Sequence, residues 1–557
     1  MKLICDVDAI KARFGLDPVG QLLFTTIRLD ARRMVTPVLA DLGDTQLLLA
    51  RQQELGNILS SGVALDDLKL YDPYVTFEDR LKTVTASATF ADAVAELAGG
   101  GPVMVGEDFP YIHHLAVSKL VDVTIERDAG ASDAVVVYEL DPAAVLSQFR
   151  AWRAAGVDVV TPIVSRVAGL EGLSDEFTSD IDTRYTALEA LADDLGVSGF
   201  LISSPPNFSE VTGMASSAGL AVLWIRETGR VLVIAPAQRY DIPGTPVGAF
   251  ASLGDAVAAQ VSGSLGIEEQ WIQIGQANQL ENAGLTIIAA SKRLGHWRDM
   301  RDREDLPFQI LAARTSVFCI EGALEYADQQ LKAGATITEN DVYRRYLELV
   351  HEFRVAGGIP FTIEPYFVNL HASNRMLYPG PPTDFVLDEN LKCLMLDAGV
   401  KISVNGVVLA TSDMARSLML ADEGIKAYEL FKTVVRDGII GQIAAGAVMS
   451  DVHEGTMAIV TNIRTQIEEL GLLAPDVDFA AQYRKRNVGH LMGKQESFAN
   501  ELRPGYNHVL EVGDLGAAEL PWLFDDYAVG TEDMWYIGKS RTYITSLSEP
   551  HVTASGS

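Results

Sequence analysis

The stretch from residue 394 to residue 418 constrains the fold most, because it places two acidic residues inside otherwise apolar sequence. It reads LMLDAGVKISVNGVVLATSDMARSL, in which two apolar runs flank Asn405-Gly406, a dipeptide typical of tight β-hairpin turns. Each run contains one aspartate, Asp397 or Asp413. Carboxylates are rarely buried without a compensating partner. The stretch therefore predicts a β-hairpin with two acids whose charges have to be compensated if they are buried.

The length of the turn decides whether the two acids meet. A three-residue loop over residues 404–406, with glycine in the left-handed conformation, places Asp397 directly opposite Asp413 with β-carbons about 5 Å apart. A two-residue loop instead sends the two acids to opposite faces. In the first arrangement the like charges cannot both stay ionised unaided, so they share a proton or hold a cation between them. The alternative is a structural role, with one aspartate in solvent at a strand end and the other paired with Arg416.

Composition limits the class of protein. The chain has 557 residues and a formal net charge of −31, and at about 150 residues per domain it divides into several domains. The acidity makes nucleic acid a poor partner. No apolar run reaches the length of a membrane span and the start of the chain lacks the apolar core of a signal peptide, so we expect a soluble, cytoplasmic protein that does not act at a membrane. Cys5, Cys319 and Cys393 are too few and too widely spaced for a disulfide framework or a zinc motif.

Helix and strand patterns divide the chain into three regions. Residues 1–172 and residues 173–302 each alternate helical stretches with short β-branched runs, which predicts two α/β domains that resemble diverged copies. Residues 303–557 combine long amphipathic helices with runs typical of antiparallel strands. This third region therefore predicts an α+β domain, which also sets the fold class of the chain.

Local patterns predict individual elements within these regions. Leu188, Leu191 and Leu195 lie at helical spacing, and Gly196 follows as a stop signal. The run SPPN predicts a turn, and GLAVLWI with RVLVIAP predicts a β-hairpin. In the third region Thr338 is the expected N-cap of a helix. The runs HVLEVGDL and DMWYIG predict strands near the C-terminus.

Three residues downstream of the hairpin extend the set of metal-binding side chains. The sequence NVGHLMGKQESF places His490 in a short loop-like stretch, RPGYNHVLEVGDL places Glu511 in a strand-like run, and YAVGTEDMWYIG places Glu532 at the start of an aromatic strand. Each of the three alone fits an ordinary structural or surface role. Together with Asp397 and Asp413 they supply four carboxylates and one imidazole, which suits divalent ions such as manganese, iron, cobalt or zinc.

With these residues in place, the third region resembles the pita-bread family, which holds methionine aminopeptidase, Xaa-Pro aminopeptidase, prolidase and creatinase. LDAGV and SDMARS look like the family's Asp-x-Gly and Asp-x-x-Arg motifs, and VGHLMG is similar to its Gly-His-Gly-x-Gly loop. PGYNHVLEVG and VGTEDMWYI resemble its two glutamate strands. The resemblance covers roughly residues 303 to 548. It implies a C-terminal pita-bread domain after two creatinase-type N-terminal domains, as in three-domain Xaa-Pro aminopeptidases, which are typically dimers.

The resemblance also implies a cofactor and roles for particular residues. By this analogy the metal ligands are Asp397, Asp413, His490, Glu511 and Glu532. The implied cofactor is two divalent metal ions, with manganese first and iron, cobalt or zinc as alternatives. Such ions lower the pKa of a bound water and polarise a carbonyl group. Glu511, beside that water, would double as the general base.

The sequence departs from the family pattern at the positions that handle substrate. Peptidases of the family carry a second histidine seven residues after the metal-binding one, where this chain has Ser497. They carry another histidine on an upstream strand, where the best match is Leu377, with His371 nearby as a candidate catalytic substitute. The candidate substrate contacts are Arg375, Tyr378, Lys494 and Glu496, with His371. For each of these a solvated surface position is an equal alternative.

These observations leave three interpretations open. The leading one is a dinuclear metal-dependent hydrolase of the Xaa-Pro aminopeptidase type, a homodimer that acts on a small peptide or small molecule. The missing histidines favour a second, a metal-dependent lyase or C–N hydrolase of a small molecule in specialised metabolism. A third is a non-enzymatic pita-bread binding module, for which the acidity would suit a basic partner. Such modules usually lose the metal ligands, and the retained set favours an enzyme.

Overall fold

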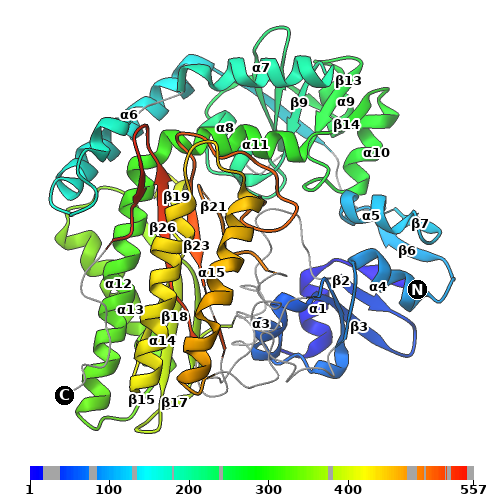
Figure 1. Ribbon diagram of the computed structural model, residues 1–557. Coiled ribbons are helices and arrows are strands. Elements are labelled where there is room, and N and C mark those ends of the chain that lie inside the picture. The colour runs from blue at the N-terminus through cyan, green and yellow to red at the C-terminus, as the bar shows by residue number, and fades with distance from the viewer. Residues whose placement is uncertain are drawn as a thin grey trace.

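The computed structural model arranges the chain as two α/β bodies and a larger C-terminal body (Figure 1). It describes residues 1–16, 38–73, 85–127, 134–177, 181–237, 242–373, 380–472, 486–494, 497–520, 522–523 and 528–547. In Figure 1 the first body is blue, the second is cyan to green, and the third contains the long helices α12 to α15. Among the described helices, none is long and apolar enough to cross a membrane.

The first body is built on a seven-stranded sheet with the order β5-β4-β3-β2-β1-β6-β7. Alternation along β2 sends Val38 and Ala40 into one apolar cluster and Leu39 into another, so the sheet has a core on each face. The elements are β1 (Lys2–Ile4), α1 (Val7–Phe14), β2 (Val38–Asp41), β3 (Gln46–Arg51), α3 (Leu55–Ser60), β4 (Leu68–Tyr71), β5 (Ala86–Ser87), α4 (Phe90–Ala98), β6 (Val103–Gly106), α5 (Tyr111–Val117) and β7 (Val123–Glu126).

The second body has a seven-stranded sheet of similar plan, with the order β12-β8-β11-β10-β9-β13-β14. In both sheets three antiparallel strands are followed by two parallel ones, β3-β2-β1-β6-β7 in the first and β11-β10-β9-β13-β14 in the second. This shared core agrees with diverged copies. The elements are β8 (Val135–Leu140), α6 (Pro142–Val164), α7 (Arg184–Leu195), β9 (Gly199–Ile202), α8 (Pro205–Thr212), β10 (Ala221–Ile225), β11 (Val231–Pro236), β12 (Thr245–Phe250), α9 (Leu253–Ala258), β13 (Ser264–Ile267), α10 (Ile274–Asn282), β14 (Thr286–Ala289) and α11 (Ser291–Asp302).

The sheets place the boundary between the first two bodies earlier than residue 172, where the sequence suggested it. β8, which begins at residue 135, pairs with β11 and β12 of the second sheet. This pairing joins segments far apart in the sequence, so local patterns do not reveal it.

Backbone hydrogen bonds connect the first two bodies. The Tyr111 amide donates to the Ile272 carbonyl at 2.9 Å, and the Ile274 amide donates to the Phe109 carbonyl at 3.0 Å.

The C-terminal body combines two larger sheets. One has the order β16-β18-β19 with β20 also paired to β18, and the other has the order β22-β21-β23-β26-β27. The strands are β16 (Thr362–Ala372), β18 (Cys393–Val404), β19 (Val407–Thr411), β20 (Met414–Met419), β21 (Gly489–Leu491), β22 (Ser497–Glu501), β23 (Leu515–Glu519), β26 (Glu532–Ile537) and β27 (Thr542–Ile544), with the short pairs β15 (Ile337–Thr338)/β17 (Val386–Leu387) and β24 (Trp522–Leu523)/β25 (Ala528–Val529).

Four helices of the C-terminal body contribute buried apolar residues to its two cores. One core contains α12 (Leu306–Lys332) and α13 (Glu339–Ala356), and a second contains α14 (Asp422–Thr433) and α15 (Met449–Glu469). The predicted N-cap of α13 is confirmed, because the Thr338 side chain accepts from the amide of Asp341 at 3.2 Å. The C-terminal region therefore has the mixed helix and strand composition that the sequence predicted.

The Asn405-Gly406 turn is present, and its loop has two residues. Val404 pairs directly with Val407, and both turn residues have positive φ, 51° for Asn405 and 79° for Gly406. Asparagine followed by glycine tolerates this left-handed geometry at low cost. The three-residue loop considered from the sequence is therefore wrong.

A bulge then changes which residues face each other in the hairpin. The register shifts between Ile402 and Ser403, and as a result Asp397 pairs with Ala415 on β20. Asp413 precedes Ala415 by two residues, so the predicted direct opposition of the two acids is also wrong. The bulge is a local irregularity that the sequence pattern does not indicate.

Two further local predictions need correction. SPPN is the start of α8 and not a turn, with Ser204 as its N-cap and the prolines in the first helical positions, where their missing amide is tolerated. HVLEVGDL does not form a strand, since β23 begins only at Leu515. The predicted helix ending at Gly196, the hairpin of β10 and β11, and the strand over DMWYIG are confirmed.

The geometry of β18 gives a testable prediction at Gly399, which follows Asp397 by two residues on this strand. A β-carbon there would meet the carbonyl oxygen of Ser412. Gly399→Ala should therefore lower the free energy of unfolding by about 1 to 3 kcal/mol, measured by urea denaturation. The control is Gly295→Ala in α11, where no atom lies within 4 Å of the added carbon. That variant should be as stable as the parent or gain about 0.5 to 1 kcal/mol, and equal losses in both variants would contradict the prediction.

Candidate metal centre

Three side chains from separate segments meet in the C-terminal body. Asp413 lies between β19 and β20, His490 lies on β21, and Glu532 begins β26. One ligand atom of each residue lies within 4.8 Å of the others, and all three residues are buried. Two carboxylates at this separation destabilise each other unless a positive charge compensates them. Two carboxylate oxygens and one imidazole are ligands that divalent ions take.

The orientation of His490 suits a metal ligand. Its Nδ1 lies 3.0 Å from the carbonyl oxygen of Leu491. A carbonyl oxygen only accepts hydrogen bonds, so in the neutral ring Nδ1 carries the proton and Nε2 keeps its lone pair. Nε2 lies 3.6 Å from Oδ2 of Asp413. The backbone contact thus turns the basic nitrogen toward the acids, as in many metal-binding histidines.

A buried ion-pair network fixes the backbone beside Glu532. Nη1 of Arg416 donates to the carbonyl oxygen of Glu532 at 2.5 Å, and its Nη2 lies 2.6 Å from Oδ1 of Asp533. Nε of Arg436 lies 2.7 Å from Oδ2 of Asp533. The two guanidinium groups hold the pKa of the Asp533 carboxyl below its usual value despite the opposing effect of burial. This network ties β20 to the first residues of β26.

Asp397 lies on β18 of the hairpin, and one of its partners is a neutral side chain. Oδ2 of Asp397 accepts a hydrogen bond from the side-chain amide of Asn369 at 2.9 Å. Asn369 on β16 is also its direct neighbour across the strands. His371 follows two residues later on the same face of β16 and is buried. The catalytic role expected for His371 remains a prediction.

The fourth candidate carboxylate is Glu519, which the sequence analysis missed. Glu519 lies directly opposite Glu532 in the pairing of β23 with β26, so both side chains leave the same face of the sheet. His490 pairs with Ala517, two residues before Glu519, and shares that face. Oε2 of Glu519 lies 3.0 Å from Nη2 of Arg486.

Glu511, the residue that the sequence analysis chose instead, lies elsewhere. Its side chain is 63 % exposed and contacts Arg303 at 3.3 Å, and its run is not a strand. The same Gly-to-Glu spacing occurs twice, from Gly505 to Glu511 and from Gly513 to Glu519. Only the second copy lies on a strand. The sequence feature that could have pointed to Glu519 is the proline at position 521, close to the position after the glutamate where the family pattern has a proline. The metal-ligand and base roles assigned to Glu511 therefore do not fit its position.

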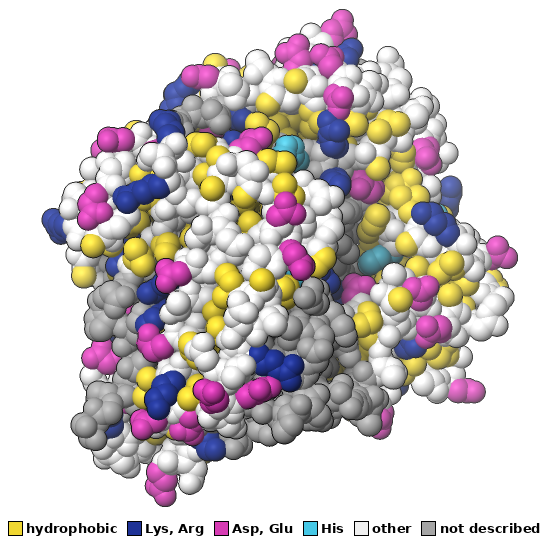
Figure 2. Space-filling view, viewed as in Figure 1, with side chains coloured by type: hydrophobic (Ala, Val, Ile, Leu, Met, Phe, Trp, Pro, Cys, Tyr) yellow, Lys and Arg dark blue, Asp and Glu magenta, His cyan; other side chains and the backbone are white. Residues whose placement is uncertain are grey.

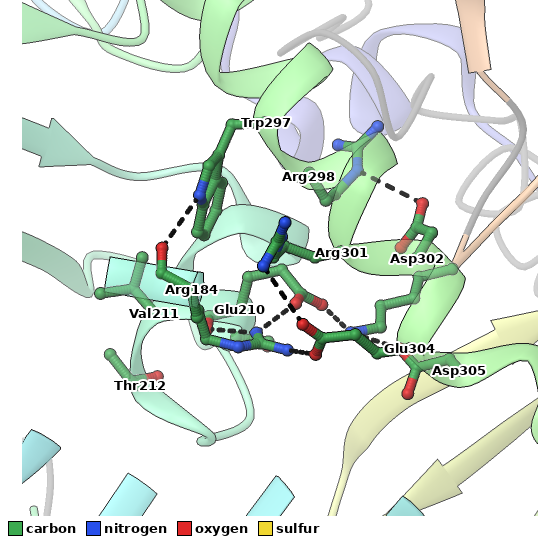
Figure 3. Close-up of polar contacts among 12 residues, drawn as sticks. Arg184, Glu210, Val211, Thr212, Trp297, Arg298, Arg301, Asp302, Glu304 and Asp305 are labelled. Carbon is green, nitrogen blue, oxygen red and sulfur yellow. Dashed lines mark hydrogen bonds and ion pairs between the residues drawn. The ribbon is translucent and has the colours of Figure 1, made fainter. Parts of the chain in front are cut away.

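Lys494, a candidate substrate contact from the sequence, lies in a buried cluster of charged side chains. Its side chain is 2 % exposed, and its side-chain nitrogen pairs with Glu210 of α8 and, at 2.9 Å, with Asp305. Arg184 pairs with Glu210 and Glu304 in the same cluster, as Figure 3 shows. The cluster joins the second body to the segment that follows His490.

This cluster contains a second close group of acids, Glu210, Asp302 and Asp305, within 4.8 Å of one another. Arg184 and Lys494 pair with Glu210 of this group, while burial favours the protonated form of its two aspartates. Burial raises the pKa of Asp302 to about 8, with a smaller contribution from the charge of Asp299. Burial likewise raises the pKa of Asp305 well above its usual range. The backbone amide of Lys494 donates to the Asp302 carboxyl, which therefore lies against this segment.

Several candidate residues lie outside the described residues. These are Arg375, Leu377, Tyr378 and Glu496, and the side chain of Ser497 is likewise not described. Their roles remain predictions.

Figure 2 shows that one face of the molecule is hollowed between the first body and the C-terminal body, with acidic and basic side chains interspersed around it.

Comparison with known proteins identifies the fold. No protein-family model matches the sequence, and no curated protein matches it. Among solved structures, a histidine-to-alanine variant of Escherichia coli aminopeptidase P aligns with a TM-score of 0.50 and 14 % identity, covering 68 % of this chain and 96 % of that chain. Xaa-Pro dipeptidase from Bacillus anthracis aligns with a TM-score of 0.49 and 15 % identity, covering 67 % of this chain and 99 % of that one.

The prolidase from Thermococcus sibiricus aligns with a TM-score of 0.48 and 16 % identity, covering 68 % of this chain and 99 % of that chain. At such low identity the similarity to aminopeptidase P establishes the fold and not the activity. The chain therefore has the pita-bread fold of the Xaa-Pro peptidases over about two thirds of its length, as the sequence resemblance implied.

The raised pKa of Asp302 gives a prediction about stability and pH. The folded state holds this proton more tightly than the unfolded state, so the group contributes stability that is fully present below pH 3.8 and is lost as the pH rises to about 8. Asp302→Asn mimics the protonated form and removes this dependence. Its free energy of unfolding should fall less steeply than that of the parent, by up to about 1.4 kcal/mol per pH unit, in urea denaturation across this window.

The control for this measurement is Asp182→Asn, at a position where the side chain is 80 % exposed. Its pH dependence should follow that of the parent. An Asp302→Asn variant whose stability changes with pH as steeply as the parent would show that Asp302 is ionised in the folded protein at neutral pH.

Proposed function

We propose that the protein is a divalent-metal-dependent hydrolase that cleaves a small peptide or amide, of the Xaa-Pro peptidase type. The observation that carries the proposal is the buried group of Asp413, His490 and Glu532, whose ligand atoms lie within 4.8 Å of one another. The pita-bread fold adds support, since the aligned structures are Xaa-Pro peptidases by name.

The residues present fit a divalent ion. Asp413, His490 and Glu532 would hold it, with Asp397 and Glu519 beside them on the two sheets. When bound, such an ion supplies Lewis-acid chemistry, by lowering the pKa of water and polarising a carbonyl group. Manganese is the first candidate, because the set is rich in carboxylates and contains one imidazole.

The chain's own residues orient this chemistry. The carbonyl of Leu491 fixes the His490 ring so that Nε2 faces Asp413. Arg416 and Asp533 hold the backbone at Glu532, and the amide of Asn369 orients the carboxylate of Asp397. These contacts keep the ligands in place before substrate binds, so little reorganisation is needed during the reaction.

A second candidate function keeps the centre and changes the substrate. The sequence has Ser497 and Leu377 where peptidases of the family have substrate-handling histidines. This favours a small molecule over a peptide, with a lyase or C–N hydrolase reaction. The binding-module interpretation is weaker, because the metal-binding set is retained. The homodimer implied by the resemblance remains a prediction.

The test combines metal content with activity. Purified protein should bind manganese and hydrolyse Xaa-Pro dipeptides or small amides when manganese is added. Asp413→Ala removes a carboxylate of the group, so its metal affinity should fall by more than the roughly 10- to 100-fold that loss of a residue supporting a ligand causes. Its activity should be lost with the metal. Metal content is read by elemental analysis and activity by product release.

Asp451→Ala, at an exposed position on α15, is the matched control and should keep both metal and activity. Protein that binds no divalent ion would contradict the proposal. Metal-loaded protein that is inert toward every Xaa-Pro peptide but cleaves a small amide or eliminates from a small acid would refute the peptidase part and favour the second candidate.

A further inference from the structure

We infer that Lys494 and Glu210 are positioning residues for the metal centre, and that through their contact the second body holds in place the segment that carries His490. This inference rests on the proposed function and extends it to a residue of the second body. It is carried by the contacts of Gly493 and Lys494, which follow His490 by three and four residues.

The carbonyl oxygen of Gly493 joins the two segments that carry Asp413 and His490. It accepts a hydrogen bond from the backbone amide of Thr411 at 3.1 Å, and Asp413 follows Thr411 by two residues. It also accepts from the side-chain amide of Gln309 on α12. A displacement of Gly493 would therefore disturb both ligand segments.

The backbone around Gly493 is closely packed. A β-carbon added at Gly493 would overlap Oδ2 of Asp302, the last residue of α11. The backbone amide of Lys494 donates to the same carboxyl group. The amide of Met492 donates to the carbonyl of Leu515 on β23 at 3.0 Å. The segment after His490 is therefore held by its backbone to α11 of the second body and to β23.

The side chain of Lys494 anchors this segment to the second body as well. It is 2 % exposed, and its nitrogen lies 2.9 Å from Oδ2 of Asp305 and also pairs with Glu210 on α8. Glu210 is itself held by Arg184, which donates to its side chain and, at 2.7 Å, to its backbone carbonyl (Figure 3). Burial lowers the pKa of the Lys494 amine, with a smaller contribution from the charge of Arg184. Because a neutral amine still donates hydrogen bonds, these contacts do not depend on its charge.

The second body also packs against the turn of the hairpin that leads to Asp413. Ala215 follows α8, and a β-carbon added at Gly406 would lie 3.0 Å from the β-carbon of Ala215. The second body therefore contacts the hairpin at its turn and the His490 segment at Lys494. The hydrogen bond from Thr411 to Gly493 connects these two contacts.

The test measures metal binding in full-length Lys494→Met, which keeps the length of the side chain and removes its donor. Loss of a residue that supports a metal ligand costs 10- to 100-fold in metal affinity, so the dissociation constant for manganese should rise by about that factor. With cobalt in place of manganese, the visible absorption bands should shift, because they report the geometry of the ligands. A purely stabilising role would lower the free energy of unfolding and leave this spectrum unchanged.

A double variant tests whether Glu210 acts through Lys494. Glu210→Gln alone should weaken manganese binding less than Lys494→Met does, because its amide oxygen still accepts. Adding Glu210→Gln to Lys494→Met should weaken binding no further, within about twofold, since residues of one network do not contribute additively. Arg230→Met is the matched control, because Arg230 pairs with Glu139 at 2.8 Å inside the second body. It should keep the manganese affinity and the cobalt spectrum of the parent.

The outcomes separate this inference from the proposed function. Folded Lys494→Met protein with the manganese affinity and cobalt spectrum of the parent would overturn the inference. Further weakening in the double variant, or equal weakening in Arg230→Met, would also overturn it, because the effect would not pass through the contact of Lys494 with Glu210. If Lys494→Met does not fold, as judged by circular dichroism, Glu210→Gln decides by the same two measurements. Parent protein that binds no divalent ion would instead overturn the proposed function itself.

Discussion

The structure depends on the close approach of Asp413 and Glu532 around the imidazole of His490. Asp413 adjoins one sheet of the C-terminal body and Glu532 belongs to the other, so the group lies where the two sheets meet. Two buried carboxylates repel each other, and a bare pair would destabilise the fold. The proposed divalent cation would remove that cost, and the neutral His490 ring, turned by the carbonyl of Leu491, would supply a further ligand. The cation that would stabilise the packing of these two acids is therefore the same one that the proposed chemistry requires.

The surrounding framework pairs several other acids with protein cations. Asp533 has two arginine partners, Glu519 has Arg486, and Glu210 has Lys494 and Arg184. Each of these acids is compensated by the protein itself. The last cluster also links the second body to the segment after His490, so the N-terminal part of the chain helps to position the centre.

Sequence reasoning predicted the mixed helix and strand composition, the long helices and three acidic or imidazole side chains that the structure brings together, because those depend on local patterns. Thr338, the Asn405-Gly406 turn and Glu532 each carry a signal within a few residues. Sequence reasoning failed for features that are determined by the pairing of strands far apart in the sequence. The bulge beside Ile402 decides the partner of Asp397, and only the pairing of β23 with β26 distinguishes Glu519 from Glu511. The membership of β8 in the second sheet was missed for the same reason.

The most direct test of the central claim is anomalous X-ray diffraction from crystals of the protein grown with manganese. The account predicts an anomalous peak bonded to a carboxylate oxygen of Asp413, Nε2 of His490 and a carboxylate oxygen of Glu532. A manganese peak at another place in the fold, or none at this group with the three side chains turned away from one another, would contradict it.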